Sequence, residues 1–265
     1  MKAIVVSEKD KAGKNIYNHL LEKGFGSKKG KWQGKTVYKE GNWLLVLTES
    51  RIIYAKEADS LNADEIIFAS RHSSEAGKPT LTTHPPGNFG PADYGGEPGK
   101  LCHVDAERMK KLHSHLLNPP FEYNVSLEVT HHGPFIRQPC CFIELGSTEK
   151  QWGNQEAGEY IAEAIMKTIK NDEEKDDEKK IETAIGIGGN HYARKFNDVQ
   201  RKENIAMGHM IPRYAQKHLD KEIVQQMIDK THPEPSKIYI DKKGTRKQAK
   251  VRKMLQKFDK EVILL

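Results

Sequence analysis

The segment Glu128–Pro134 (EVTHHGP) brings a carboxylate and two adjacent imidazoles to a Gly-Pro turn. It follows an apolar, β-branched run from Val125 to Val129, and such runs are typical of strands. Glycine allows unusual dihedral angles and proline lacks a backbone donor, so the strand is predicted to end at this turn. Sites of α/β proteins gather at strand ends, and the segment is therefore predicted to form the rim of a hydrolytic site. A pair of hydrogen-bonded surface histidines at a turn is the alternative interpretation.

The composition indicates one large α/β domain. The chain has 265 residues, of which 36% are hydrophobic and 30% are charged, and its mean hydropathy is −0.74. This length can bury one sizeable core, and we expect a single domain over residues 1–265. No apolar run approaches the ~20 residues needed to span a bilayer. The first residues lack the apolar core of a signal peptide, so a cytoplasmic protein without a membrane segment is expected.

The charge balance favours a polyanionic partner. The formal net charge is +6 and the isoelectric point is about 9.0. Nine Lys and Arg residues lie between Lys237 and Lys257, and they include a predicted basic amphipathic helix near residues 246–258. Basic side chains on such a helix can bind nucleic-acid phosphates, although a merely solvated helix face is the more common role. The three cysteines have no C-x-x-C spacing, which disfavours a disulfide scaffold or a cysteine zinc finger.

Alternating strand and helix patterns predict a mixed sheet flanked by helices. The apolar segment Lys2–Val6 predicts a strand, and the helix after it is predicted to be capped by Ser7 and to end at Gly24. The Lys- and Gly-rich segment Ser27–Lys35 is expected to be a loop. The acidic segment near 171–180 contains no apolar residue and is predicted to be a solvated surface segment.

Polar side chains follow four of the predicted strands at the point where each strand ends. The four endings are Arg71-His72, His131-His132, Ser147-Thr148 and His191. If the strands are mostly parallel neighbours, these ends converge on one rim of the sheet. His84 and His209 are expected to join this rim from loops.

Two chemistries suit such a histidine-rich rim. Neutral imidazoles with a carboxylate are good zinc ligands, and zinc lowers the pKa of bound water to about 7. Alternatively, one histidine acts as a general base, while backbone N–H groups near Gly188-Gly189 or Gly146-Ser147 stabilise an oxyanion. A cysteine or serine nucleophile is disfavoured, because the adjacent cysteines lie in an apolar strand and no G-x-S-x-G elbow is present.

Six motifs resemble, in the same order, those of the D-aminoacyl-tRNA deacylase family of the archaeal and plant type. They are Ser70–Ser74, Leu81–His84, Thr130–Pro134, Ile143–Ser147, Gly186–Tyr192 and Gly208–Pro212. The resemblance runs in order from the first strand to the C-terminus and so covers nearly the whole chain. Several motifs in one order are far more specific than any single one. One departure is Asn190, which stands where a third glycine is expected before His191. Asparagine also tolerates left-handed dihedral angles.

The resemblance implies an α/β fold like that of the phosphorylase and peptidyl-tRNA hydrolase group. It also implies zinc dependence and hydrolysis of the ester between a D-amino acid and the 3′ end of tRNA, and we expect the protein to act as a monomer. The predicted catalytic residues are Glu128, His131, His132 and His191. The predicted zinc ligands are His72, His84, His132 and His209. The predicted substrate-binding residues are Arg71, Ser147, Thr148, Gly188, Gly189, Lys250 and Lys253.

Other functions stay open at this point. A peptidyl-tRNA hydrolase-like or nucleoside phosphorylase-like enzyme is an alternative on the same fold, and a non-catalytic RNA-binding protein is another. Action on N-blocked peptidyl-tRNA or phosphate-dependent nucleoside cleavage would indicate the first two. RNA binding with a steep salt dependence, together with no change of activity on His131→Ala and His132→Ala, would indicate the third. How the histidines divide between metal ligand and base also stays open.

Overall fold

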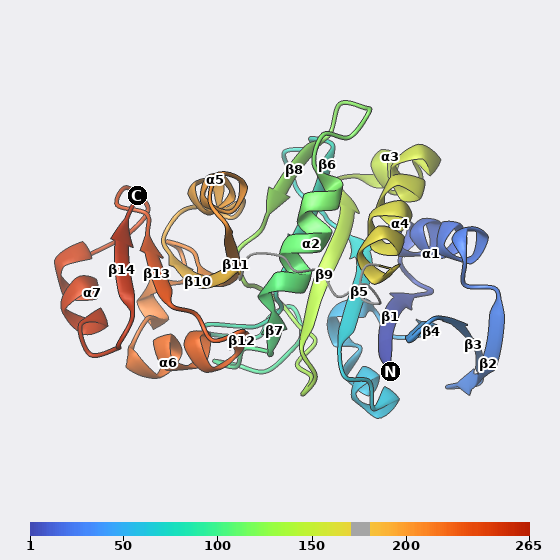
Figure 1. Cartoon of the computed structure of the whole chain (residues 1–265), viewed down its shortest axis with the longest axis horizontal. Coiled ribbons are helices and arrows are strands. Elements are labelled where there is room, and N and C mark those ends of the chain that lie inside the picture. Colours follow the sequence, from blue (N-terminus) through green and yellow to red (C-terminus); the bar gives the residue numbers. More distant parts are fainter. Residues whose placement is uncertain (171–180) are drawn as a thin grey trace.

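A computed structural model describes residues 1–170 and 181–265, and its largest element is a mixed sheet of eight strands (Figure 1). In spatial order these strands are β2 (Ser27–Trp32), β3 (Lys35–Glu40), β4 (Trp43–Thr48), β1 (Lys2–Ser7), β5 (Ile66–Arg71), β9 (Cys140–Gly146), β6 (Thr80–His84) and β8 (Asn124–Leu127). The central strands β4, β1, β5 and β9 are parallel. The direction reverses at β6, which is antiparallel to β9 and parallel to β8.

A second sheet of four parallel strands lies beside the first. Its strands, in spatial order, are β11 (Ile205–Ile211), β10 (Glu182–Ile187), β13 (Lys237–Ile240) and β14 (Glu261–Leu264). A short parallel pair, β7 (Val104–Asp105) with β12 (Thr231–His232), completes the strands of the described residues. The predicted α/β class with a mixed sheet flanked by helices is confirmed, whereas the separate second sheet was not predicted.

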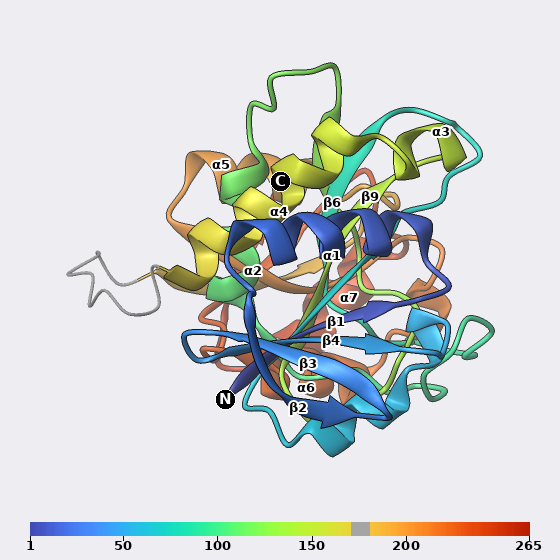
Figure 2. The ribbon, with the colours of Figure 1, turned by 90° about the vertical axis from the view of Figure 1, so that its right-hand side faces the viewer.

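Helices cover one face of the eight-stranded sheet (Figure 2). They are α1 (Lys11–Lys23), α2 (Ala106–Leu116) and α4 (Gln155–Lys170), and the short α3 (Glu149–Trp152) precedes α4. Side chains of β1 alternate between the two faces: Ile4 and Val6 pack under these helices, while Ala3 and Val5 face the opposite side. There the 3₁₀ helices η1 (Ile52–Tyr54) and η2 (Lys56–Leu61) close the core.

Helices also cover both faces of the second sheet. They are α5 (Arg194–Lys202), α6 (Lys221–Asp229) and α7 (Gln248–Leu255), and the 3₁₀ helix η3 (Gln216–His218) lies between β11 and α6. Helices α6 and α7 share a core with Ile185 and Ile187, whereas α5 packs on the opposite face with Met207. The core around α5 is continuous with the core beneath α1, α2 and α4, so the two sheets are joined by buried apolar contacts.

Several local predictions are corrected by the structure. Helix α1 is capped by Asp10, which directly precedes Lys11 and whose carboxylate accepts from the N–H of Gly13. Ser7 is the last residue of β1, and its hydroxyl donates to the carbonyl of Ser50. The predicted loop Ser27–Lys35 instead contains the edge strand β2, since backbone pairing with β3 outweighs its poor strand composition. Its exposed lysines are typical of strands that must not pair further.

Other predictions agree with the structure. Helix α1 ends at Gly24, and the basic helix α7 lies within the predicted range 246–258. No helix of the described residues is long and apolar enough to cross a membrane. The acidic segment 171–180 lies outside the described residues.

Candidate active site

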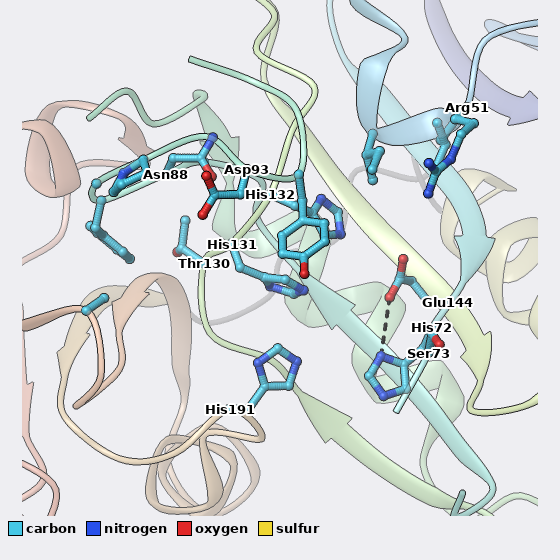
Figure 3. Close-up of a pocket in the computed structure, with 18 of the residues that line it drawn as sticks. Arg51, His72, Ser73, Asn88, Asp93, Thr130, His131, His132, Glu144 and His191 are labelled. Atoms are coloured by element: carbon cyan, nitrogen blue, oxygen red, sulfur yellow. Dashed lines mark ion pairs between the residues drawn. The ribbon is translucent and has the colours of Figure 1, made fainter. Parts of the chain in front are cut away.

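A cleft of about 1000 Å³ is lined by residues that follow strands of both sheets. In Figure 3 the side chains of His72, His131, His132, Glu144 and His191 converge within it. His72 follows β5 and Glu144 lies in β9, whereas His191 follows β10 of the second sheet. The cleft therefore depends on how the two sheets are joined.

The opening segment Glu128–Pro134 makes this joint. The N–H of Glu128 donates to the carbonyl of Thr83 in β6 of the first sheet. The next two N–H groups donate to the carbonyls of His191 and Met210, which belong to the second sheet and its β10 connection. The chain thus crosses from one sheet to the other at the position where it carries its catalytic candidates.

His72, Glu128 and His191 form one group whose ligand atoms lie close enough together to hold a metal ion. The Glu128 side chain is completely buried, and its carboxylate oxygens lie 2.6 Å from Nε2 of His191 and 3.0 Å from Nδ1 of His72. Although these distances are short, neither oxygen has a hydrogen-bond partner among the described residues. A buried carboxylate without aligned donors costs free energy unless a cation compensates it. A cation among these three side chains would satisfy both oxygens.

A second group consists of His84, His131 and His132. Each Nδ1 lies beside a backbone carbonyl: 3.3 Å from that of Pro85, 2.8 Å from that of Val129 and 2.6 Å from that of Gly133, respectively. An Nδ1–H bound to a carbonyl fixes the tautomer that leaves Nε2 free as a metal ligand. The buried Nε2 of His84 has no hydrogen-bond partner among the described residues. This donor set fits a divalent transition metal.

Two carboxylates connect the groups. An oxygen of Glu128 lies 3.5 Å from Nε2 of His131, and one oxygen of Glu144 lies 3.8 Å from His72 and 3.7 Å from His84. The other oxygen of Glu144 accepts a hydrogen bond of 2.6 Å from the Ser70 hydroxyl. The two groups are therefore adjacent parts of one centre.

Burial and neighbouring charges set the protonation of this centre. Burial, together with the charges of His84 and His132, lowers the pKa of His131 well below its usual range. Burial and the charge of His84 lower the pKa of His132 to about 4. Both imidazoles are therefore neutral at pH 7, which is the form that binds metal ions.

In the group around Glu128, the interaction of the carboxylate with the imidazoles outweighs the effect of burial on the pKa values. Burial alone would raise the pKa of Glu128, but His191 and His72 outweigh it and lower this pKa well below the usual range. Burial lowers the pKa of His72, but the Glu128 and Glu144 carboxylates outweigh burial and raise it to about 10. Glu128 is thus an anion at pH 7, and a metal ion bound by this group would have to displace the proton that the two carboxylates hold on His72.

His209 does not line the cleft. It is completely buried under the opening segment, where Nδ1 lies 3.0 Å from the Thr130 hydroxyl and Nε2 lies 2.9 Å from the carbonyl of Cys102. Burial lowers the pKa of His209 to about 3. Because both ring nitrogens are already engaged, its place in the structure is that of a packing residue at the joint, not that of the predicted ligand.

The predicted substrate-binding residues are dispersed. Arg71 lines the cleft, but the remaining members of that prediction lie outside its lining: Ser147, Thr148, Gly188, Gly189, Lys250 and Lys253. Ser147 is buried and donates to the carbonyl of Lys78, while Thr148 forms the capping box of α3. Lys250 and Lys253 are exposed on α7.

Gly188 and Gly189 determine the backbone conformation before His191. Both residues have positive φ angles, of 113° and 80°, and turn the chain sharply before His191. A Cβ on Gly188 would lie 2.5 Å from the Thr245 hydroxyl oxygen. The N–H of Gly188 already donates to the carbonyl of Ile211, so it is unavailable as the predicted oxyanion donor.

Some residues of the cleft were not predicted as site residues. Glu144 was identifiable in principle, since a carboxylate within the apolar run of β9 is a costly placement that calls for a function. The loop residues Asn88 and Asp93 (Figure 3) and Tyr214 carried no such signal, because their position depends on tertiary contacts.

Comparisons with known proteins agree on one family. The sequence model of the D-aminoacyl-tRNA deacylase family matches residues 59–263. The D-aminoacyl-tRNA deacylase of Pyrococcus furiosus is 38% identical over 257 residues, which are 93% of this chain and 92% of that protein. The D-aminoacyl-tRNA deacylase of Archaeoglobus fulgidus is 36% identical over 260 residues, covering 94% and 90%.

A solved structure gives independent support for the fold. A crystal structure described as a conserved protein of unknown function superposes with a TM-score of 0.88 and 33% identity. The match covers all of this chain and 95% of the other. With the family sequence model matching most of its length, the chain belongs to the D-aminoacyl-tRNA deacylase family.

Proposed function

We propose that this protein hydrolyses the ester bond between a D-amino acid and the 3′ end of tRNA. One observation carries the proposal: a chain of this family holds a His/Glu group and an adjacent group of three histidines at a cleft of about 1000 Å³. In the reaction the oxygen of water bonds to the ester carbonyl carbon, and the bond from that carbon to the ribose oxygen breaks. The proton lost by water ends on the ribose oxygen, which gives a free D-amino acid and tRNA.

Zinc is the proposed cofactor, with one ion for each group. The ligands are His72, Glu128 and His191 for one ion, and His84, His131 and His132 for the other. Bound zinc polarises an ester carbonyl and brings the pKa of water to about 7. Imidazole and carboxylate ligands are those that zinc prefers when its site is catalytic.

The protein's own side chains orient this centre. Backbone carbonyls hold the imidazoles of the second group. The Ser70 hydroxyl fixes one oxygen of Glu144, and the other oxygen faces Nδ1 of His72 and Nε2 of His84. Such surrounding contacts usually change metal affinity or activity by about 10–100-fold. All ligand candidates come from one chain, which supports action as a monomer.

The remaining basic residues are proposed to contact tRNA outside the cleft. Lys250 and Lys253 are exposed on α7 and do not line the cleft, so they would meet the tRNA body away from its charged end. Because charged tRNA is used in the cytoplasm, we propose that the protein acts there.

The protein is expected to release D-tyrosine from D-tyrosyl-tRNA at least about tenfold faster than L-tyrosine from the L isomer. A cleft shaped for one configuration excludes the other sterically, and each factor of ten corresponds to about 1.4 kcal/mol in the transition state. Initial rates with both isomers under matched conditions measure this. N-acetyl-D-tyrosyl-tRNA is the control for a peptidyl-tRNA hydrolase. Equal rates on both isomers, or no hydrolysis of either, would contradict the proposed function.

A further inference from the structure

Three exposed tyrosines gather at the mouth of the cleft. Among the described residues, the large hydrophobic side chains with high exposure are Met1 and these three: Tyr54 (47%), Tyr94 (69%) and Tyr214 (55%). Tyr94 and Tyr214 line the cleft, and Tyr54 lies against the loop that carries Tyr94. Exposed aromatic side chains that cluster at one site usually mark a binding surface. We call these three residues the tyrosine rim.

The rim is held in place by tight backbone contacts. The carbonyl of Tyr94 accepts from the N–H of Gly133, directly after His132. The side-chain amide of Asn88 donates to the carbonyl of Gly95 at 2.8 Å. A Cβ on Gly95 would lie 2.0 Å from the carbonyl oxygen of Ile53. The loop therefore packs so closely against η1 that only glycine fits at this position. The exposure of Tyr94 is therefore a fixed feature of a packed loop.

Tyr214, the third member of the rim, lies next to the candidate catalytic centre. The hydroxyl of Tyr214 lies 3.5 Å from Nδ1 of His191, so its ring stands at the border of the first metal-binding group. The hydroxyl groups of Tyr54 and Tyr94 form no hydrogen bond within residues 1–170 and 181–265. Neither hydroxyl is therefore engaged within the described part of the chain, and the exposed rings are free to stack on a partner.

Three positively charged side chains line the cleft beside the tyrosine rim. Lys9, Arg51 and Lys217 line the cleft and are exposed, and none of them pairs with a carboxylate in the part of the chain that the structure describes. The guanidinium of Arg51 lies 5.7 Å from the ring centre of Tyr54. Figure 3 shows Arg51 and Asp93 on opposite sides of His132. Flat aromatic faces combined with unpaired cations are the pattern by which proteins bind single-stranded nucleic acid.

We propose that the tyrosine rim stacks on the unpaired bases at the 3′ end of the substrate tRNA, while Arg51 and Lys217 bind the adjoining phosphates. This inference rests on the proposed function and deepens it, because the aminoacyl ester is attached to the terminal ribose of a single-stranded end. With its bases stacked on the rim, the end is held at the mouth of the cleft and the ester extends toward the histidines. The rim then selects nucleic-acid esters over esters of simple alcohols.

Tyr94 is the residue to test, because it is the most exposed member and its hydroxyl is unpaired. Tyr94→Ala is expected to weaken binding of the fluorescently labelled RNA trinucleotide CCA about tenfold, equivalent to about 1.4 kcal/mol. Tyr94→Phe keeps the ring and is expected to bind like the wild type. KM for D-tyrosyl-tRNA should rise in parallel in the alanine variant, with kcat nearly unchanged. The rate on the methyl ester of D-tyrosine, which has no base, should not change.

The contrary outcomes are equally specific. The inference is overturned if Tyr94→Ala binds CCA as well as the wild type, or if Tyr94→Phe loses as much affinity as Tyr94→Ala. It is also overturned if CCA binding does not weaken at higher salt, because Arg51 and Lys217 would then make no contact with the phosphates. Rim-dependent CCA binding without any hydrolysis of D-tyrosyl-tRNA would refute the proposed function and leave the inference standing. Hydrolysis of D-tyrosyl-tRNA without rim-dependent CCA binding would refute the inference and leave the proposed function standing.

Discussion

Replacing Glu128 by glutamine is expected to lower kcat/KM for D-tyrosyl-tRNA by about 10³-fold or more. The Glu128 carboxylate is fully buried and lies within 3.5 Å of three imidazoles, those of His72, His131 and His191. Glutamine keeps the shape of the side chain but removes its negative charge. A cation held by this group would lose its only anionic ligand, and several kcal/mol of transition-state stabilisation would disappear.

Two measurements support the test of Glu128. Metal analysis of the purified variant should show fewer bound ions than the wild type, and an unchanged circular dichroism spectrum would separate ligand loss from misfolding. Glu122→Gln is the matched control, since Glu122 is an exposed carboxylate six residues earlier and outside the cleft lining. It should retain wild-type activity. A Glu128→Gln variant with normal metal content and activity within threefold of the wild type would rule out this role.

Removal of metal by a chelator is expected to abolish ester hydrolysis, and added zinc should restore it. The donor set offers two three-residue groups, so the wild type should bind two ions per chain. His131→Ala removes a member of the second group that also contacts Glu128, and it should reduce both the metal content and the rate about 10²-fold or more. Mass spectrometry of the native protein and single-turnover rates check these results.

The control for the histidine series is His115→Ala. His115 lies half-buried on α2, outside both groups and outside the cleft lining, so its loss should leave metal content and rate unchanged. Full activity in protein proven free of metal would contradict the zinc proposal. In that case a histidine acting as general base would be the remaining mechanism.

Local patterns predicted the elements that depend on neighbouring residues. The β-branched run of β1 and the Gly24 end of α1 are set by contacts within a few positions, and both predictions agree with the structure. Strand β2 was predicted wrongly as a loop, because pairing with β3, not its own composition, makes it a strand.

Local sequence patterns did not predict the order and direction of the strands. Strand ends were expected to converge because neighbouring strands run parallel, yet β8 runs opposite to β9 and β10 belongs to the second sheet. The histidines still meet, because the segment Glu128–Pro134 bonds to both sheets. Its N–H groups had to find carbonyl partners, and those partners lie 39 or more residues away along the chain.

By itself, the sequence determined which side chains are available for the chemistry: the histidines and carboxylates at strand ends, the excess of positive charge and the order of the family motifs. The tertiary structure alone decided which of them share a centre. It placed Glu144 between the two groups, buried His209 as a packing residue and set the tyrosine rim at the mouth of the cleft. Side-chain identity is a local property, whereas distance within the centre depends on sheet packing and on backbone hydrogen bonds between distant segments.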